Sequence, residues 1–280
     1  SKIETLKDEM RRLQKLEARM LATPGQQISL TDPDARSMAT SGRGSGMVAY
    51  NVQSAVDTTH HLIVAHEVTN SGSDRSQLST MAKQAKAALK TDKLEVVADR
   101  GYFKSEEILA CDKAGITVTL PKPQTSNNKA RGRFVKPDFR YVSEDDVYIC
   151  PAGERLNYHF TNVEAGLALR HYWTTACQSC AIKSQCTTAK ERRIRRWEHE
   201  HVLEDVQRRL DEHPEKMRQR RETVEHPFGT IKSWMGYTHF QMKTLKRVGT
   251  EMALHVLAYN LKRVMNIIGI RPLIAAMRAV

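Results

Sequence analysis

The sequence predicts an α/β fold, and three observations support this prediction. Several short stretches place apolar residues on alternate positions, which is typical of half-buried strands. Other stretches repeat apolar residues at helical spacing. The two kinds of stretch alternate over residues 47–120, as expected for strands joined by helices. At 280 residues the chain can bury a substantial core, in one large domain or two modest ones.

The first predicted elements are an amphipathic helix and a short strand. T-P-G at 23–25 ends the helix, and residues 26–32 have the pattern of a strand. Because the chain starts inside the helical pattern and without methionine, we interpret residues 1–25 as the helical remnant of an upstream region. A glycine-rich loop, S-G-R-G-S-G, follows at 41–46.

The next elements complete a recognisable order. The pattern predicts a hairpin of residues 47–56 with 61–68, and then a helix over 74–90 that begins at Ser73 or Asp74. A strand over 94–99, a helix over 105–114 and a last strand over 116–120 follow. This order matches the ribonuclease-H-like fold, in which a mixed sheet carries acids on two neighbouring central strands, although other α/β folds begin with a similar order. Residues 26–120 are therefore expected to form the first part of such a domain.

The rest of the chain changes character twice. Residues 121–139 are polar and irregular, which is typical of a linker. The module that follows contains four cysteines, so we expect residues 121–197 to be a small insertion. Helical spacing returns in residues 198–280, which are expected to be the C-terminal helical part of the interrupted domain.

Charge favours a polyanionic partner. The formal net charge is +12, and residues 216–247 carry eight Lys or Arg against two acids. K-E-R-R-I-R-R at 190–196 adds a second basic cluster. No apolar run approaches the roughly 20 residues of a membrane helix, and neither cluster adjoins a broad apolar face. Nucleic acid is therefore favoured over membrane, and a simple basic soluble protein is the alternative.

Three acids are candidates for catalysis. Asp32 and Asp99 end predicted strands, where open α/β sheets commonly place their sites. Each taken alone could instead form a turn or cap a helix. Together with Glu225 they would repel one another unless cations shared them, and Mg²⁺ or Mn²⁺ prefers such hard oxygen ligands. Two such ions about 4 Å apart can activate a nucleophile and stabilise the leaving oxygen of a phosphodiester.

Residues 220–232 place one acid among cations. On a helix, Arg221, Glu225 and Lys232 would lie within about 40° of one another. This face could offer a metal-binding carboxylate between two groups that hold phosphates, or simply an Arg221 and Glu225 ion pair on a solvated helix. Pro227 predicts a kink or a helix start near residue 226.

Five stretches together resemble one known family. They are D-P-D-A-R at 32–36, Y-N-V-Q-S-A-V-D at 50–57, V-T-N-S-G-S-D at 68–74, A-D-R-G-Y-F at 98–103 and V-E-H-P-F-G-T-I-K-S-W-M-G at 224–236. They are similar to the catalytic domain of a bacterial insertion-sequence transposase of the DDE type. The group is the one with the signature Tyr, two residues, Arg, three residues, Glu, six residues, Lys. Arg221, Glu225 and Lys232 match it, whereas Arg218 occupies the tyrosine position.

This resemblance implies an activity and a set of roles. Asp32, with Asp34 as its rival, Asp99 and Glu225 would hold two Mg²⁺ ions, while Asn70 and Asp74 would only cap and position a helix. Arg221 and Lys232 would contact DNA. The implied reaction is strand cleavage at transposon ends followed by strand transfer, by a homodimer bound to DNA in the bacterial cytoplasm at the nucleoid. A ribonuclease-H-like nuclease and an inactive DNA-binding remnant are the alternatives.

The cysteines and one tryptophan raise separate questions. Cys150, Cys177, Cys180 and Cys186 include one C-x₂-C pair and could hold a structural Zn²⁺, or could be plain thiols. His199, His201 and His226 are rival ligands, although a surface or core role is expected for each. We expect Trp234, like Phe228 and Met235, to pack beneath the helix of Glu225, and stacking on a flipped base is the alternative.

Overall fold

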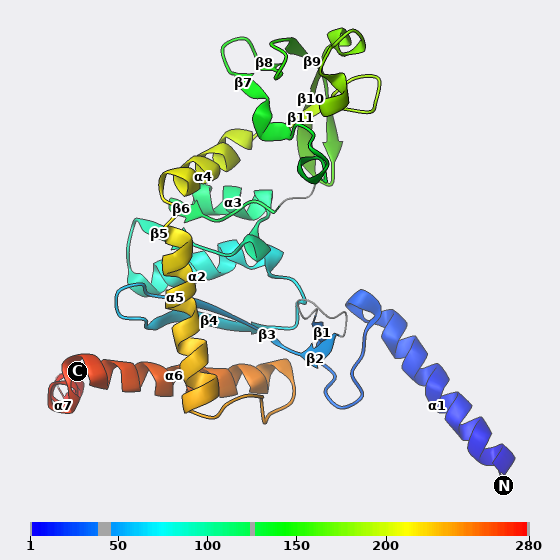
Figure 1. Ribbon diagram of the computed structural model, residues 1–280. Coiled ribbons are helices and arrows are strands. Elements are labelled where there is room, and N and C mark those ends of the chain that lie inside the picture. Colours follow the sequence, from blue (N-terminus) through cyan, green and yellow to red (C-terminus); the bar gives the residue numbers. More distant parts are fainter. Residues whose placement is uncertain (1, 39–45, 124–126, 279–280) are drawn as a thin grey trace. The chain divides into compact units, whose positions relative to one another are not determined.

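The computed structural model of the chain describes residues 2–38, 46–123 and 127–278 (Figure 1). It divides into two compact units. The first unit comprises Ser1–Pro121 and Arg209–Val280, and the second comprises Lys122–Arg208. The second unit therefore starts within one residue of the predicted insertion and extends beyond residue 197.

The first unit contains three pairs of strands. They are β1 (Arg36–Met38) with β2 (Met47–Ala49), β3 (Asn51–Val56) with β4 (Ile63–Thr69), and β5 (Leu94–Val97) with β6 (Ile116–Thr119). The first two pairs are antiparallel and the third is parallel. The mixed α/β class and the hairpin are thus as predicted. Among the described residues, however, the pairs remain three separate sheets rather than one mixed sheet.

The predicted strand over residues 26–32 is wrong. A 3₁₀ turn covers Pro24–Gln26, and the segment that follows has no strand partner among the described residues. The backbone N–H of Asp32 instead donates to the Ser29 hydroxyl, and the Asp32 carbonyl accepts from the N–H of Ala35. Such local bonds offer the backbone an alternative to a sheet ladder. Most of the predicted loop at 41–46 lies outside the described residues.

Helices of the first half follow the predicted pattern closely. They are α1 (Lys2–Ala22), α2 (Leu78–Leu89) and α3 (Ser105–Lys113). The segment before α2 begins as a 3₁₀ turn over Asp74–Ser76, which Ser73 caps through its hydroxyl and the N–H of Arg75. Asp74 is therefore the first residue of that turn, and its carboxylate does not cap the turn but accepts from the side chains of Asn51 and Gln53.

The C-terminal part is helical, as predicted. It contains α5 (Lys216–Gly229), a π-helical turn η8 (Thr230–Trp234), α6 (Leu245–Ile268) and α7 (Ile270–Arg278). Pro227 lies inside α5 without ending it, so the helix does not start near residue 226, which was one of the two predicted outcomes. The helical hydrogen-bond pattern changes directly after α5, in the π-helical turn, where the N–H of Met235 donates to the carbonyl of Thr230 five residues earlier.

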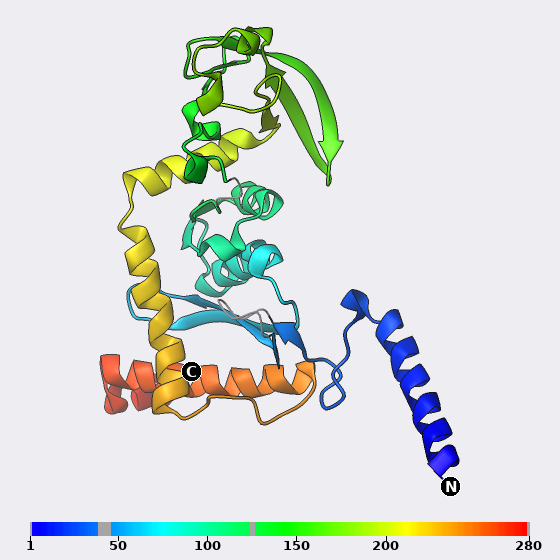
Figure 2. The same ribbon diagram turned by 45° about the vertical axis from the view of Figure 1, so that its right-hand side comes forward.

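The core of the first unit joins its two halves. Ile63 of β4 packs with Met252, Val256 and Tyr259 of α6 and with Ile231 of η8. The Asn260 side chain also accepts from the N–H of Ile63 at 2.9 Å and donates to its carbonyl at 2.8 Å. Figures 1 and 2 show α6 lying along the β3–β4 hairpin.

The second unit is built on one antiparallel sheet, in the order β11-β10-β9-β8-β7. Its strands are β7 (Arg140–Val142), β8 (Val147–Ile149), β9 (Arg155–Glu164), β10 (Leu167–Trp173) and β11 (Ile194–Trp197). One face buries an aromatic core of Phe139, Tyr148, Leu156, Tyr172 and Ile194. Helix α4 (Glu200–Glu212) follows and spans the boundary between the units.

Candidate functional site

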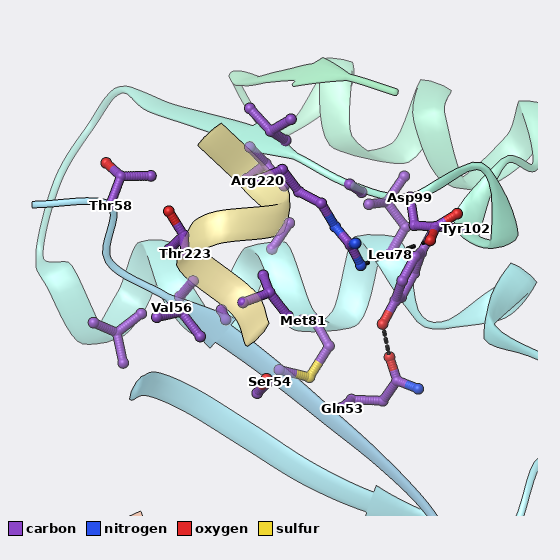
Figure 3. A pocket seen from close by; sticks show the side chains of 18 of the residues that line it. Gln53, Ser54, Val56, Thr58, Leu78, Met81, Asp99, Tyr102, Arg220 and Thr223 are labelled. Carbon is purple, nitrogen blue, oxygen red and sulfur yellow. Dashed lines mark hydrogen bonds and ion pairs between the residues drawn. The ribbon is translucent and has the colours of Figure 1, made fainter. Parts of the chain in front are cut away.

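A pocket of about 450 Å³ in the first unit contains one of the predicted acids, Asp99. The facing edges of β3 and β5 line it on two sides without pairing, and α2 and α5 complete its walls. The walls are largely apolar, with Val56, Leu78 and Met81 among them (Figure 3). Gln53, Tyr102 and Arg220 gather near Asp99, so the pocket combines a largely apolar lining with a charged end at Asp99 (Figure 3).

Asp99 follows β5 and is held by two contacts. Its Oδ1 accepts from the N–H of Gly101 at 3.1 Å, which caps the 3₁₀ turn Arg100–Tyr102. Its Oδ2 lies 3.7 Å from the guanidinium of Arg220, which reaches across from α5 (Figure 3). The Asp99 side chain is 49% exposed and that of Arg220 is 23% exposed. The carboxylate is thus fixed by the turn but remains accessible to a ligand.

A second carboxylate lies beside the same turn. Oδ1 of Asp74 accepts from the side-chain amides of Asn51 and Gln53, each at 2.7 Å, and its Oδ2 would lie 3.6 Å from a Cβ added at Gly101. Gln53 is only 1% exposed and accepts from the Tyr102 hydroxyl through Oε1. Burial, with the nearby charge of Asp74, raises the pKa of Tyr102 to about 12, so this hydroxyl remains a donor.

Asp32 occupies a different environment. It is 8% exposed, and its carboxylate accepts from the Tyr50 hydroxyl at 2.8 Å and from the N–H of Thr244 at 3.1 Å. The neighbouring Asp34 accepts from the N–H of Leu245 at 2.8 Å. Burial opposes ionisation of Asp32, but these hydrogen bonds and the charge of Lys243 keep its pKa below the usual value. Both aspartates therefore accept hydrogen bonds from backbone N–H groups at the start of α6. For Asp32 this is the alternative role given above, in which the acid forms a turn or caps a helix.

The structure does not bring the three predicted acids together. Glu225 is exposed on α5 and is not among the residues that line the pocket, and Asp32 is held at α6. Across the described ranges, no group of three or more His, Cys, Asp or Glu side chains has an arrangement that could hold a metal ion. The catalytic roles of Asp32, Asp99 and Glu225 stay predictions. Arg221 and Lys232 are exposed, and their DNA contacts likewise stay predictions.

Sequence reasoning missed Arg220, Asp74 and Gln53. Arg220 is next to Arg221, which the family signature selects. Only the contact of Arg220 with Asp99 in the folded chain distinguishes the two arginines. Gln53 did carry a signal, because a polar side chain in a strand with apolar neighbours needs a buried partner. That partner is Asp74, which we expected to serve only as a helix cap.

The four cysteines of the predicted insertion line one small pocket of the second unit as free thiols. Burial, and to a lesser extent the other three thiols, raise the pKa of Cys186, while Arg192 lowers it. His226 lies elsewhere, bonded to the Tyr259 hydroxyl at 2.9 Å against the core of the first unit. The half-buried ring thus lies at the edge of the core, within the surface or core role that was expected of it.

Trp234 is 85% exposed, so the expectation that it packs beneath α5 is wrong. Phe228 and Met235 do pack against the core of the first unit, as expected. The π-helical turn that ends at Trp234 separates these neighbours and leaves the indole in solvent.

Comparison with known proteins adds a family match. Residues 149–265 match a family model described as a transposase DDE domain. This match supports a transposase of the DDE type, a class that binds DNA and generally uses divalent metal ions. The matched range includes Arg221, Glu225 and Lys232 but neither Asp32 nor Asp99. No curated protein and no solved structure matches the chain. No helix in the described part of the chain is sufficiently long and apolar to cross a membrane.

Proposed function

We propose that this chain is the catalytic part of a bacterial insertion-sequence transposase with a ribonuclease-H-like fold, which cleaves DNA at transposon ends and transfers the strands into target DNA. One observation carries the proposal beyond the family match. Asp99 follows a parallel strand and faces Arg220, which lies on the helix that also bears Glu225. A carboxylate beside a cation suits chemistry on a phosphodiester, because a positioned cation can stabilise the charge on the phosphate during the reaction.

The proposed roles follow the family signature. Asp32, Asp99 and Glu225 would hold Mg²⁺ or Mn²⁺, and Arg221 and Lys232 would contact DNA near the scissile phosphate. The three carboxylates as they now lie do not fit a shared metal site, so no reaction step is assigned to an ion. Arg220 offsets the charge of Asp99 in the absence of metal. Gly101 and Arg220 together orient the Asp99 carboxylate toward the pocket.

Nicking of supercoiled plasmid in Mg²⁺ or Mn²⁺ tests this proposal without knowledge of the end sequence. Asp99→Asn, Glu225→Gln and Asp32→Asn should each reduce nicking to background while DNA binding persists. Asp112→Asn, at an exposed position of α3 outside the pocket, is the matched control and should nick like the parent protein. Full nicking by Asp99→Asn would remove the basis of the proposal.

Two alternatives predict different products. A nuclease of the same fold would cleave but never join strands, so a strand-transfer product with a second DNA separates it from a transposase. A non-catalytic DNA-binding remnant would nick nothing. Its binding would show steep salt dependence and little sequence preference, because phosphate contacts carry no sequence information. Two ends must be joined, so we propose that the chain acts as a homodimer on DNA, at the nucleoid.

We also propose that Cys150, Cys177, Cys180 and Cys186 hold a structural Zn²⁺ in the second unit. The support is that all four thiols line one pocket, beside the aromatic core of the sheet. Their present arrangement does not fit a metal ion, so binding would require the four sulfur atoms to adopt a different arrangement. Four thiolates are a common ligand set for structural zinc.

Metal analysis of the purified chain tests the zinc proposal. We expect one zinc per chain, lost in Cys177→Ser and in Cys180→Ser. Cys111→Ser is the matched control, since Cys111 is buried in α3 of the first unit and should leave the zinc content unchanged. Background zinc in the parent protein would show that these are plain thiols.

A further inference from the structure

The outer face of the sheet in the second unit carries aromatic rings that no core covers. Register explains why. A β-bulge between His171 and Tyr172 shifts the pairing of β9 with β10, so Tyr158 lies opposite Tyr172 whereas Phe160 lies opposite His171. Adjacent residues of a strand point to opposite faces, and a bulge adds one residue to one strand. Tyr158 therefore lies on the core face with Tyr172, and Phe160 lies on the outer face.

Rings on the outer face are stacked in pairs. His159 stacks on Trp173 with ring centroids 3.4 Å apart and an angle of 5° between the ring planes. Phe160 stacks on the buried His171 at 4.5 Å and meets the edge of Trp173 at 5.9 Å. Because His171 covers one side of Phe160, the 43% exposure of Phe160 belongs to its outer side. The exposed rings of His159 and Phe160 thus form an aromatic platform on the β9–β10 hairpin, with two faces that are steeply inclined to each other because Trp173 is parallel to one ring and edge-on to the other. Figure 2 shows this hairpin as a long projection.

Cations lie beside this platform. The guanidinium of Arg193 is 4.8 Å from the centroid of the Trp173 ring, and Arg195 is paired with His171 across β10 and β11. Each arginine has an acidic partner, Glu191 for Arg193 and Glu164 for Arg195. The Glu164 side chain is 42% exposed, whereas that of Glu191 is only 12% exposed. Exposed ion pairs are worth little, so a phosphate can replace the Glu164 carboxylate at small cost.

We propose that the platform of His159 and Phe160, with Arg193 and Arg195, binds unpaired bases of single-stranded DNA. Each ring offers a face on which a base can stack, and the arginines are placed to hold the adjoining phosphates. In duplex DNA the faces of each base are covered by the neighbouring base pairs, so these rings would bind single-stranded DNA in preference to duplex DNA. This inference rests on the proposed function, because strand cleavage and transfer expose unpaired bases near the enzyme.

Fluorescence anisotropy with a labelled single-stranded oligonucleotide of mixed sequence and the full chain tests the proposal. Phe160→Ala should weaken binding about tenfold, as expected for the loss of one stacked base. Tyr158→Ala is the matched control, since Tyr158 is 42% exposed on the same strand but lies on the core face; its affinity should stay within about twofold of the parent. Phe160→Leu keeps an apolar side chain without a ring and should bind as weakly as Phe160→Ala.

Three results would overturn the inference. They are equal losses for Phe160→Ala and Tyr158→Ala, an unchanged affinity for both Phe160 variants, and an equal loss of duplex affinity, which would indicate phosphate contacts alone. Asp99→Asn distinguishes this inference from the proposed function. It should abolish nicking yet bind single strands like the parent, so either conclusion can fail while the other stands.

Discussion

Arg220 and Asp99 form an ion pair at 3.7 Å although the whole second unit lies between them in the sequence. The pair connects the two halves of the first unit at the charged end of the pocket. It also shows which arginine of the basic run R-Q-R-R at 218–221 turns inward. Arg220 faces Asp99, whereas Arg221 is exposed.

The two neighbouring arginines should therefore have separable effects. Arg220→Gln leaves Asp99 without its cation, and we expect nicking to fall about tenfold, equivalent to about 1.4 kcal/mol of barrier, with little change in DNA affinity. Arg221→Gln should weaken DNA binding and reduce its salt dependence by about one phosphate contact. Nicking rates and anisotropy at several salt concentrations distinguish them. Equal effects of Arg220→Gln and Arg221→Gln on DNA affinity would contradict the assignment of Arg220 to Asp99 and of Arg221 to DNA.

Gln53 should be a strong determinant of stability. Gln53→Leu removes one donor from Asp74 and the acceptor of the Tyr102 hydroxyl in a buried place, so we expect a loss of about 1–3 kcal/mol in the free energy of unfolding. Urea denaturation measures this. Gln84→Ala, at an exposed position of α2, serves as the control and should change stability by less than about 0.5 kcal/mol. An unchanged free energy of unfolding for Gln53→Leu would mean that the hydrogen bonds of Gln53 with Asp74 and Tyr102 are not formed.

Acid sensitivity should report the environment of Asp32. Burial raises the pKa of Asp32, but its hydrogen bonds outweigh this effect and hold the pKa in the folded chain below its ordinary value of 3.8. Its contribution to stability is therefore complete above the unfolded pKa and is lost as pH falls through the folded pKa. Asp32→Asn should flatten the decrease in unfolding free energy below about pH 4. Asp8→Asn on α1, where the side chain is 71% exposed, should retain the slope of the parent.

The two aromatic residues near Lys232 should differ sharply in their effect on folding. Phe228→Ala removes a ring that packs on the core of the first unit and should lower the free energy of unfolding by about 2 kcal/mol or more. Trp234→Ala removes an exposed ring and should change it by less than about 0.5 kcal/mol. Thermal and urea unfolding test both. A large loss for Trp234→Ala would show that the indole is packed.

Local periodicity predicted the helices and the β3–β4 hairpin because those elements bury one regular face. It failed for residues 26–32, where Ser29 and Asp32 bond to nearby backbone in preference to a strand. The bulge in β9 is a further case. Simple alternation would place Tyr158 and Phe160 on the same face, and only the observed register separates them.

The candidate site was predictable only in part. Asp99 could be found because it is an acid directly after a short apolar strand. Its partner Arg220 could not, because spacing along a helix does not show which of two adjacent arginines turns toward a pocket built by residues far away in the chain. The apolar walls from β3, α2 and β5 likewise depend on contacts between segments that no local pattern relates.

The position of α6 has a consequence for synthesis of the chain on the ribosome. Ile63 of the hairpin packs against Met252 and Val256 and is bonded to Asn260, all in α6. Because α6 comes much later in the sequence, the β3–β4 hairpin is synthesised long before these partners. The second unit is continuous in sequence and can close as soon as Arg208 has left the exit tunnel. At about 5–20 residues per second, the hairpin waits with one apolar face uncovered for roughly ten seconds or more. During this interval the nascent chain offers a binding surface to chaperones that the finished protein no longer has.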